Sequence, residues 1–140
     1  MKYIDLGLPS GTLWADRNVG AQNPEEYGDH LDFDEAQKHN SPTEEQITEL
    51  LNLKSEWTTL NGVKGRRFYG KNGNSIFLPA GGYDRRGAEL FGYYWSSTQY
   101  PYNSYYAYSL YFYSSSASIN NYNRYYGQSV RPVKMKGGEQ

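Results

Sequence analysis

Alternating apolar and polar positions predict β-strands along much of this chain. The clearest example is the segment 107–113, AYSLYFY, in which Tyr108, Leu110 and Phe112 fall on one face of an extended backbone. The other face carries Ala107, Ser109, Tyr111 and Tyr113. We interpret this segment as a half-buried strand, with one apolar face toward the core and one wet, aromatic face toward solvent.

Turn residues separate several further strands. Pro9 and Gly11 end a strand at 3–8, and another begins at Thr12. The pair Asn72-Gly73 supplies the positive φ angles of a hairpin turn. We expect the remaining strands at 62–69, 75–78, 93–97 and 129–133.

Two helices are expected between the first strands and the later ones. Asp32 or Asp34 is suited to cap a short helix at 35–39. Ser41 or Thr43 is suited to cap a second helix, with acidic residues in its first turn. Its inward stripe is predicted to contain Ile47, Leu50 and Leu51.

This order of elements predicts an α+β domain of two helices and antiparallel β-strands. With 140 residues the chain is long enough for one domain with a sizeable core, which we place at 1–135. Residues 136–140 are expected to form a disordered tail. Trp14, Trp57 and Trp95 lie in separate predicted strands and are expected to meet in one core.

The segment 93–126 has an unusual composition. It holds twelve of the 16 tyrosines, is otherwise rich in Ser and Asn, and has Arg124 as its only charge. Tyrosine gives large, rigid contact area, and Ser and Asn give adaptable hydrogen bonds, as in antibody combining surfaces. We interpret the segment as a recognition surface. The alternatives are ordinary strand tyrosines, or a low-complexity segment that is disordered or self-associates.

The composition excludes several functions. The chain has no cysteine, so disulfides, cysteine-ligated zinc, iron–sulfur clusters and thiol nucleophiles are absent. The net charge of −1 gives no bulk attraction to nucleic acid, and no apolar run approaches the ~20 residues of a membrane span. Met1 leads directly into an amphipathic strand, so we expect no signal peptide.

Two groups of charged residues resemble a metal site or a nucleic-acid site in composition. The run 29–35, DHLDFDE, offers carboxylates and an imidazole but lacks the Gly and distal Glu of a calcium loop, so we interpret it as solvated or helix-capping. Basic residues beside aromatics can bind single-stranded nucleic acid, but we interpret this group as a solvated face: Lys64, Arg66, Arg67, Lys71, Arg85 and Arg86. His30 and His39 have no partner nucleophile. We therefore expect no catalytic residue, metal or cofactor.

Several longer sequence segments resemble those of a known family. They are YIDLGLPSGTLWA at 3–15, NVGA at 18–21, NGVKG at 61–65, GNSIFLPA at 73–80, GYYWSST at 92–98 and RYYGQSVRPV at 124–133. Together they resemble the C-type-lectin-fold domains of Bacteroidales and their phages, in the formylglycine-generating-enzyme-like branch that includes the "major paralogous domain" proteins. Many of these are variable proteins of diversity-generating retroelements.

The resemblance implies a C-type lectin fold with paired N- and C-terminal strands, and a variable, ligand-binding segment at 93–126. Scaffold positions would be Tyr94, Trp95, Leu110, Phe112, Val130 and Val133, with Arg124 and Gly127 as framework. The diversified, ligand-facing set would be Tyr100, Tyr102, Asn103, Tyr105, Ser109, Tyr111, Tyr113, Ser115, Asn120, Asn121, Tyr122, Asn123 and Tyr125. Mutagenesis at template adenines would explain the excess of Tyr, Ser and Asn.

Within that family, formylglycine generation requires cysteines, which this chain lacks, and calcium-dependent lectins use Glu-Pro-Asn or Gln-Pro-Asp motifs, which are also absent. The resulting hypothesis is a non-enzymatic, receptor-recognition protein of a phage virion or bacterial surface. Its expected partner is a macromolecular surface ligand, protein or glycan, with no nucleic acid and no membrane insertion. The alternative is a structural or adhesion domain that self-associates through the aromatic face.

Overall fold

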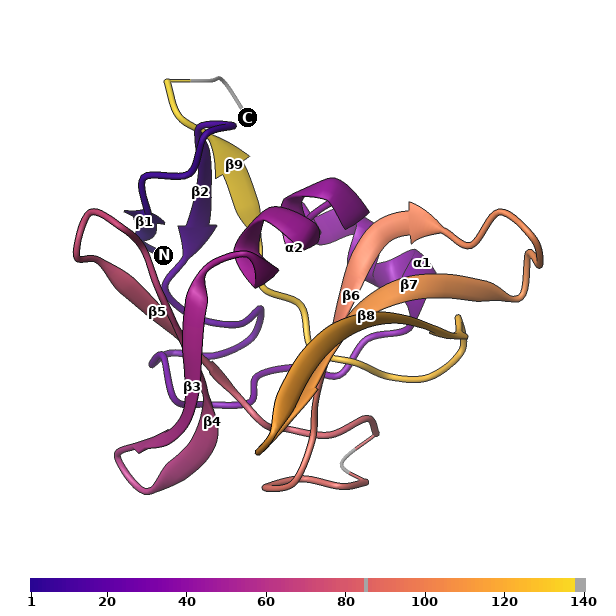
Figure 1. Cartoon of the computed structure of the whole chain (residues 1–140). Helices are drawn as coiled ribbons and strands as arrows, with labels where there is room; N and C mark the ends of the chain where they lie inside the picture. Colours follow the sequence, from indigo (N-terminus) through magenta and orange to yellow (C-terminus); the bar gives the residue numbers. More distant parts are fainter. Residues whose placement is uncertain (85, 138–140) are drawn as a thin grey trace.

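A computed structural model describes residues 1–84 and 86–137 and contains three small antiparallel sheets (Figure 1). The first is β1-β2-β9, formed by Tyr3–Asp5, Thr12–Ala15 and Val133–Met135. The second is β3-β4-β5, formed by Lys54–Leu60, Val63–Tyr69 and Ser75–Pro79. The third is β6-β7-β8, formed by Gly92–Gln99, Tyr106–Tyr113 and Ser116–Asn123. The predicted α+β class is confirmed.

The two ends of the chain share one sheet. β2 lies between β1 and β9, with Trp14 opposite both Ile4 and Val133. The C-terminal strand therefore pairs with the second strand rather than the first. The strand predicted at 129–133 is mostly a connection: Ser129 forms an isolated bridge with Tyr94, and β9 starts only at Val133.

The first residue of the tail expected at 136–140, Lys136, makes contacts with the rest of the fold. The Lys136 backbone N–H donates to the carbonyl of Gly11 at 2.8 Å, and its ammonium group lies 3.1 Å from Asp5. Residues 138–140 lie outside the described residues, so the prediction for them stays untested.

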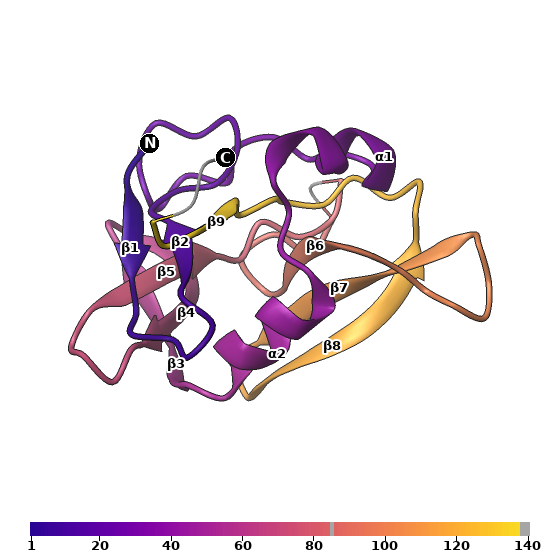
Figure 2. The same cartoon turned by 90° about the horizontal axis from the view of Figure 1, so that it is seen from above.

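The two helices begin at side-chain caps. Asp32 accepts a hydrogen bond from the backbone N–H of Glu35 at the start of α1 (Phe33–Ala36), which continues as a short 3₁₀ turn, Gln37–His39. Thr43 and Gln46 form a reciprocal capping box at the start of α2 (Glu44–Leu51). Figure 2 shows α2 lying above β7 and β8, where it buries Ile47 and Leu50 against the third sheet.

The buried side chains form two clusters, and the prediction that the three tryptophans share one core is wrong. Trp14 belongs to the main cluster, which also holds Leu110 and Phe112, and the half-buried Trp57 packs against it. Trp95 belongs to the second, smaller cluster, where its ring meets that of Phe33 edge-on at 5.5 Å. The reason is the strand alternation: Trp95 lies opposite Ser109, on the face of the third sheet that points away from α2.

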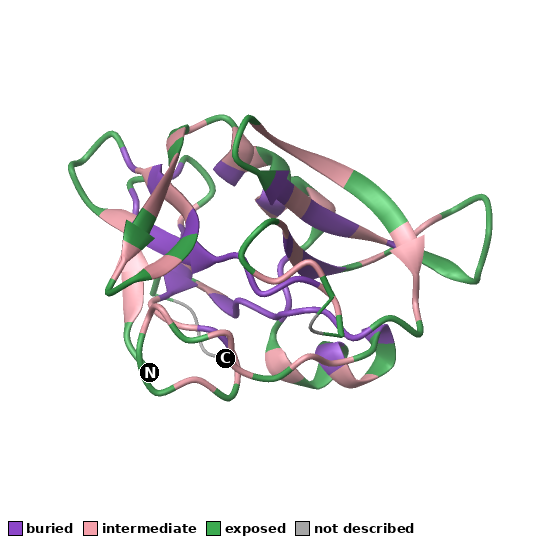
Figure 3. Cartoon of the chain, turned by 90° about the horizontal axis from the view of Figure 1, so that it is seen from below, coloured by how far each residue is buried: buried purple, intermediate pink, exposed green. Residues whose placement is uncertain are grey.

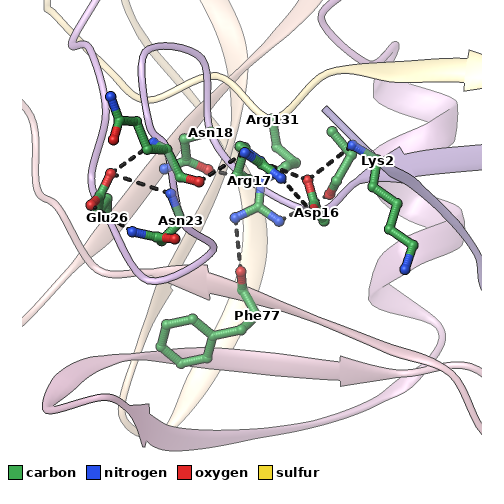
Figure 4. A network of polar contacts seen from close by, with 10 residues as sticks. Lys2, Asp16, Arg17, Asn18, Asn23, Glu26, Phe77 and Arg131 are labelled. Atoms are coloured by element: carbon green, nitrogen blue, oxygen red, sulfur yellow. Dashed lines mark hydrogen bonds and ion pairs between the residues drawn. The ribbon is translucent and has the colours of Figure 1, made fainter.

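A buried arginine joins the three sheets (Figure 4). Arg131 is 1% exposed and donates to the Asn18 side chain, to the Ala15 carbonyl and to the Phe77 carbonyl at 2.8–3.1 Å. Asn18 in turn donates to the Tyr94 hydroxyl, at 3.0 Å. Ala15, Phe77 and Tyr94 belong to different sheets, so this network fixes how the third sheet sits on the other two. Burial lowers the pKa of Arg131 to about 10, and the guanidinium stays charged at neutral pH.

Candidate ligand-binding surface

The third sheet has one covered face and one face that is open at one end. Tyr94, Leu110 and Phe112 point toward α2 and are each 2% exposed or less. The opposite face carries Tyr93 and Tyr111, which lie directly across from each other, and Ser118 beside Tyr111 on the next strand. In Figure 3, which views the molecule from below, no helix lies over β7 and β8 on this side.

A continuous group of aromatic rings occupies the open end of that face. We call it the aromatic patch, and its members are Tyr83, Phe91, Tyr93, Tyr111, Tyr113, Tyr122 and Tyr126. Four of these residues come from β6, β7 and β8, and the other three come from the loops that flank the sheet. No member is charged at neutral pH, and every member is partly or fully exposed.

Tyr93 lies at the centre of the aromatic patch. The centroid of its ring lies 5.1 Å from that of Tyr111, 5.2 Å from Tyr83 and 5.2 Å from Tyr122. Tyr83 also stacks on Tyr126, with centroids 5.0 Å apart and planes inclined by 26°. Edge-to-face and offset-stacked ring pairs contribute about 0.5–1.5 kcal/mol each beyond simple burial. The rings therefore hold one another in place, and a partner would meet a preformed surface.

The hydroxyl groups of Tyr93, Tyr111 and Tyr122 remain donors at neutral pH. Partial burial is the main cause that raises the pKa of Tyr93, Tyr111 and Tyr122 above its ordinary value. Within the described residues, the hydroxyls of Tyr93, Tyr111 and Tyr113 form no hydrogen bond. The patch thus offers apolar ring faces together with unused donors and acceptors, a combination that is common in protein combining surfaces.

Only part of the expected ligand-facing set reaches the aromatic patch. Tyr111, Tyr113 and Tyr122 are members of the patch, and Asn120 lies on the same face beside Tyr122. Tyr111 and Tyr113 lie on the outward, aromatic face that was predicted for the strand at 107–113, whereas no strand was predicted at 116–123, which carries Asn120 and Tyr122.

A second group of expected residues lies in the long loop between β6 and β7. Tyr100, Tyr102, Asn103 and Tyr105 are all in this loop, and Tyr102 is 84% exposed. The Tyr100 ring packs edge-on against Tyr102 and against Tyr108, at 5.5 and 5.4 Å between centroids. Tyr108 shares its strand face with Leu110 and Phe112, so this group belongs to the other side of the sheet from the patch.

The prediction that Ser109 faces a ligand is wrong. Ser109 is 0% exposed, and its hydroxyl donates a hydrogen bond to the Gln128 side-chain oxygen at 2.7 Å. Ala107, on the same face, is also buried and packs with Trp95 and Val130. The alternation did place both residues on the face opposite α2, but the returning segment that contains Gln128 and Val130 covers that end of the face.

The remaining expected residues are spread along the edge of the sheet. Ser115 is exposed in the turn between β7 and β8, and Tyr125 is 69% exposed just after β8. Asn121 and Asn123 lie opposite Tyr108 and Tyr106, on the α2 side of the sheet. Ser115, Asn121 and Tyr125 are exposed, and Asn123 is half-buried. None of the four belongs to the aromatic patch.

The six positions expected as scaffold are all buried, with at most 6% exposure: Tyr94, Trp95, Leu110, Phe112, Val130 and Val133. The sequence interpretation missed four members of the patch: Tyr83, Phe91, Tyr93 and Tyr126. Tyr93 could have been found, because successive residues of a strand point to opposite faces and its neighbour Tyr94 was expected to be buried. Tyr83 lies in a segment without periodicity, and nothing in the sequence placed its ring on Tyr126.

The charged residues of the segment 29–35 make contacts within the fold. His30 lies 2.9 Å from the Gly81 carbonyl, Asp32 caps α1, and Asp34 pairs with Arg124 at 2.5 Å. Among the described residues, no group of three or more carboxylates and histidines could hold a metal ion. Asp29, His30 and Asp84 line an open depression of about 460 Å³.

The basic residues are partly engaged within the fold. Arg66 donates to Ser55 and to the carbonyl of Tyr113, and Arg67 donates to Ser75 and lies over the Phe77 ring. Arg85 lies outside the described residues. In the described part of the chain, none of the helices has the length and apolar character needed to span a bilayer.

Comparison with known families shows a match to a model described as a domain of unknown function, DUF8237, over residues 28–133. The chain belongs to the DUF8237 family. The matched region begins after β2 and contains both helices, the second and third sheets and the whole aromatic patch. No curated protein and no solved structure matches the chain significantly.

Proposed function

We propose that this DUF8237 protein is a non-enzymatic binding module that recognises a macromolecular surface ligand through its aromatic patch. The observation that carries the proposal is the arrangement of the patch: a mutually packed, uncharged group of rings with exposed faces, in which Tyr93, Tyr111 and Tyr113 have hydroxyls without a hydrogen bond in the described part of the chain, next to a separate buried core. Folding requires only the covered face of the sheet, where Leu110 and Phe112 are buried. The rings on the other face are then available for a partner.

The finer parts of the proposal are a C-type lectin fold and diversification by a retroelement. They are supported by the phrases quoted above, by the shared terminal sheet and by the concentration of Tyr, Ser and Asn at 93–126. Diversification has its own test in the neighbouring DNA. We expect a reverse-transcriptase gene and a near-copy of the segment coding for 93–126 that differs at adenines. A genome without both would remove this part of the proposal.

Binding is tested with the fluorescently labelled protein on a glycan array, on a protein array and on intact Bacteroidales cells. The decisive variant is Tyr113→Ala, at the exposed rim of the patch. The matched control is Tyr106→Ala, because Tyr106 is in the same strand, has the same 36% exposure, and lies on the opposite face. Both variants should stay within about 1 kcal/mol of the parent stability, as expected for surface changes.

The expected result is that the parent and Tyr106→Ala bind the same target and that Tyr113→Ala binds at least about tenfold more weakly, as for an aromatic side chain that the partner buries. Equal losses in the two variants would show that the patch is not the binding surface. No binding by the parent to any of the three targets would contradict the proposed function.

A further inference from the structure

The outer edge of β8 differs from every other strand edge in the described part of the molecule. β8 runs over Ser116–Asn123, SASINNYN, with no charge, no proline and no break in its register with β7. Natural proteins protect exposed edges by keeping them short, by placing charges, prolines or bulges on them, or by covering them. β8 shows none of these protections.

Each of the other strand edges has one of these protections. β1 and β9 have three residues each, and β5 ends in Pro79. β3 carries exposed Lys54 and Glu56. The outer side of β6 is covered, since Trp95 donates to the Ser129 carbonyl and Ser129 donates to Tyr93.

The register of β7 and β8 shows which backbone groups point outward. The Arg124 N–H donates to the Tyr105 carbonyl at 2.9 Å, so these two residues form a hydrogen-bonded pair. Hydrogen-bonded and non-hydrogen-bonded pairs alternate in an antiparallel ladder, which makes Ala107–Tyr122, Ser109–Asn120 and Tyr111–Ser118 hydrogen-bonded as well. The residues between them on β8 direct their N–H and C=O groups away from β7: Ala117, Ile119 and Asn121. These groups form no hydrogen bond within the described residues.

We propose that the free edge of β8 pairs with β8 of a second copy of this chain, in an antiparallel register centred on Ile119. In this register Ile119 faces the partner copy's own Ile119 position, and Ala117 faces the position of Asn121. Every outward donor then meets an outward acceptor. The strand contains no charge, so its own copy brings no like-charge repulsion, and Ile119 gains an apolar neighbour on the α2 side.

The symmetry of this pairing has a functional consequence. Residues paired across an antiparallel ladder point to the same side of the sheet, so the two aromatic patches would lie on the same side of one continuous sheet. A dimer would thus present two patches to one target surface, which raises the overall avidity without new contacts. The dimer goes beyond the proposed binding function, since a monomer could also bind through its single patch.

The first experiment measures the oligomeric state by sedimentation velocity from about 1 μM to about 1 mM, the range in which weak dimers dissociate. The parent should form dimers as its concentration rises. The variant Asn121→Pro removes an outward N–H that makes no bond to β7, a position where edge strands tolerate proline. It should raise the dissociation constant at least tenfold. The control Asn121→Ala keeps the N–H and should dimerise like the parent.

The second experiment tests the register and does not depend on how well the proline variant folds. The chain has no cysteine, and the proposed register places Ser118 opposite position 120 of the other copy in a non-hydrogen-bonded pair, within disulfide reach. An equal mixture of Ser118→Cys and Asn120→Cys chains should form a cross-linked dimer on mild oxidation. Each variant alone should cross-link far less.

Each other outcome overturns the proposal. A parent that stays monomeric throughout has no β8 pairing, and a dimer that Asn121→Pro leaves intact is formed elsewhere, for example through the aromatic patch. Cross-linking that is equal in the mixture and in the single variants indicates random collision. None of these results affects the Tyr113→Ala binding test, so the two proposals fail separately.

Discussion

The two faces of the third sheet carry similar residues in different surroundings. On the α2 side, Tyr94 is 2% exposed, and both the donor and the acceptor of its hydroxyl are used, by Pro79 and Asn18. On the other side, its neighbour Tyr93 keeps part of its ring exposed and its hydroxyl unpaired. Tyrosine content alone therefore does not mark a recognition surface. In the proposed binding surface the distinguishing feature is a ring that other rings hold while its hydroxyl makes no hydrogen bond.

The largest predicted effect separates adjacent residues of β7. Phe112 is 0% exposed, packs against Tyr94 at 6.0 Å between ring centroids and contributes to the main core. Phe112→Ala should lower the free energy of unfolding by about 3–5 kcal/mol, the usual cost of a large cavity. Tyr113→Ala, one residue further on, should cost about 1 kcal/mol or less. Urea unfolding of both variants measures the difference, and similar losses would mean that the patch is a second core.

Ser109 provides a sharper test of where the open face ends. Ser109→Ala leaves the buried Gln128 oxygen without its donor, and the Gln128 side-chain nitrogen already lacks a partner. We expect a loss of about 1–3 kcal/mol, the penalty of an unsatisfied buried polar group. Ser115→Ala, in the exposed turn between β7 and β8, is the control and should change stability by less than about 0.5 kcal/mol. Equal stability of the two variants would show that this end of the face is open after all.

The ring contacts of Tyr93 should give a smaller effect. Tyr93→Leu keeps an apolar side chain but removes the ring pairs with Tyr83, Tyr111 and Tyr122 and the more distant one with Phe91. It should cost about 1.5 kcal/mol in thermal or urea unfolding, near the low end for several ring pairs because the patch is partly exposed. Tyr102→Leu is the control, because Tyr102 is 84% exposed in the loop. A Tyr93→Leu variant as stable as the control would indicate that the rings do not hold one another rigidly.

These contrasts also show which side-chain positions can be predicted from the sequence. The inward positions of Leu110 and Phe112, and the outward position of Tyr111, follow from the two-residue period of a strand. The burial of Ser109 does not follow, because the period gives the face of a residue and not what covers that face. The covering segment around Gln128 arrives from beyond β8 through a bridge to Leu31, a long-range contact that no local pattern encodes.

The same limit applies to the composition of the patch. A window at 93–126 selects residues by tyrosine content, and so it includes Tyr102, which lies in the long loop. It omits Tyr83 and Phe91, which precede the window but contact its rings. Long-range hydrogen bonds between Asp84 and Gly127 hold the loop that carries Tyr83 beside the segment that follows β8, a contact between distant parts of the chain that no local pattern encodes.

The smallest predicted effect concerns alkaline pH. Burial raises the pKa of Tyr93 and Tyr122 above its ordinary value near 10, so the folded protein keeps these protons when the unfolded chain loses them. The unfolded state then binds fewer protons, and the free energy of unfolding falls as the pH rises above about 10, while below that value the contribution is fully present. Urea unfolding at several pH values between about 8 and 11 measures this slope. Tyr93→Phe removes one of the titrating groups and should fall less steeply than the parent. An identical slope in the two proteins would mean that the ring at the centre of the patch is as well solvated as a free tyrosine.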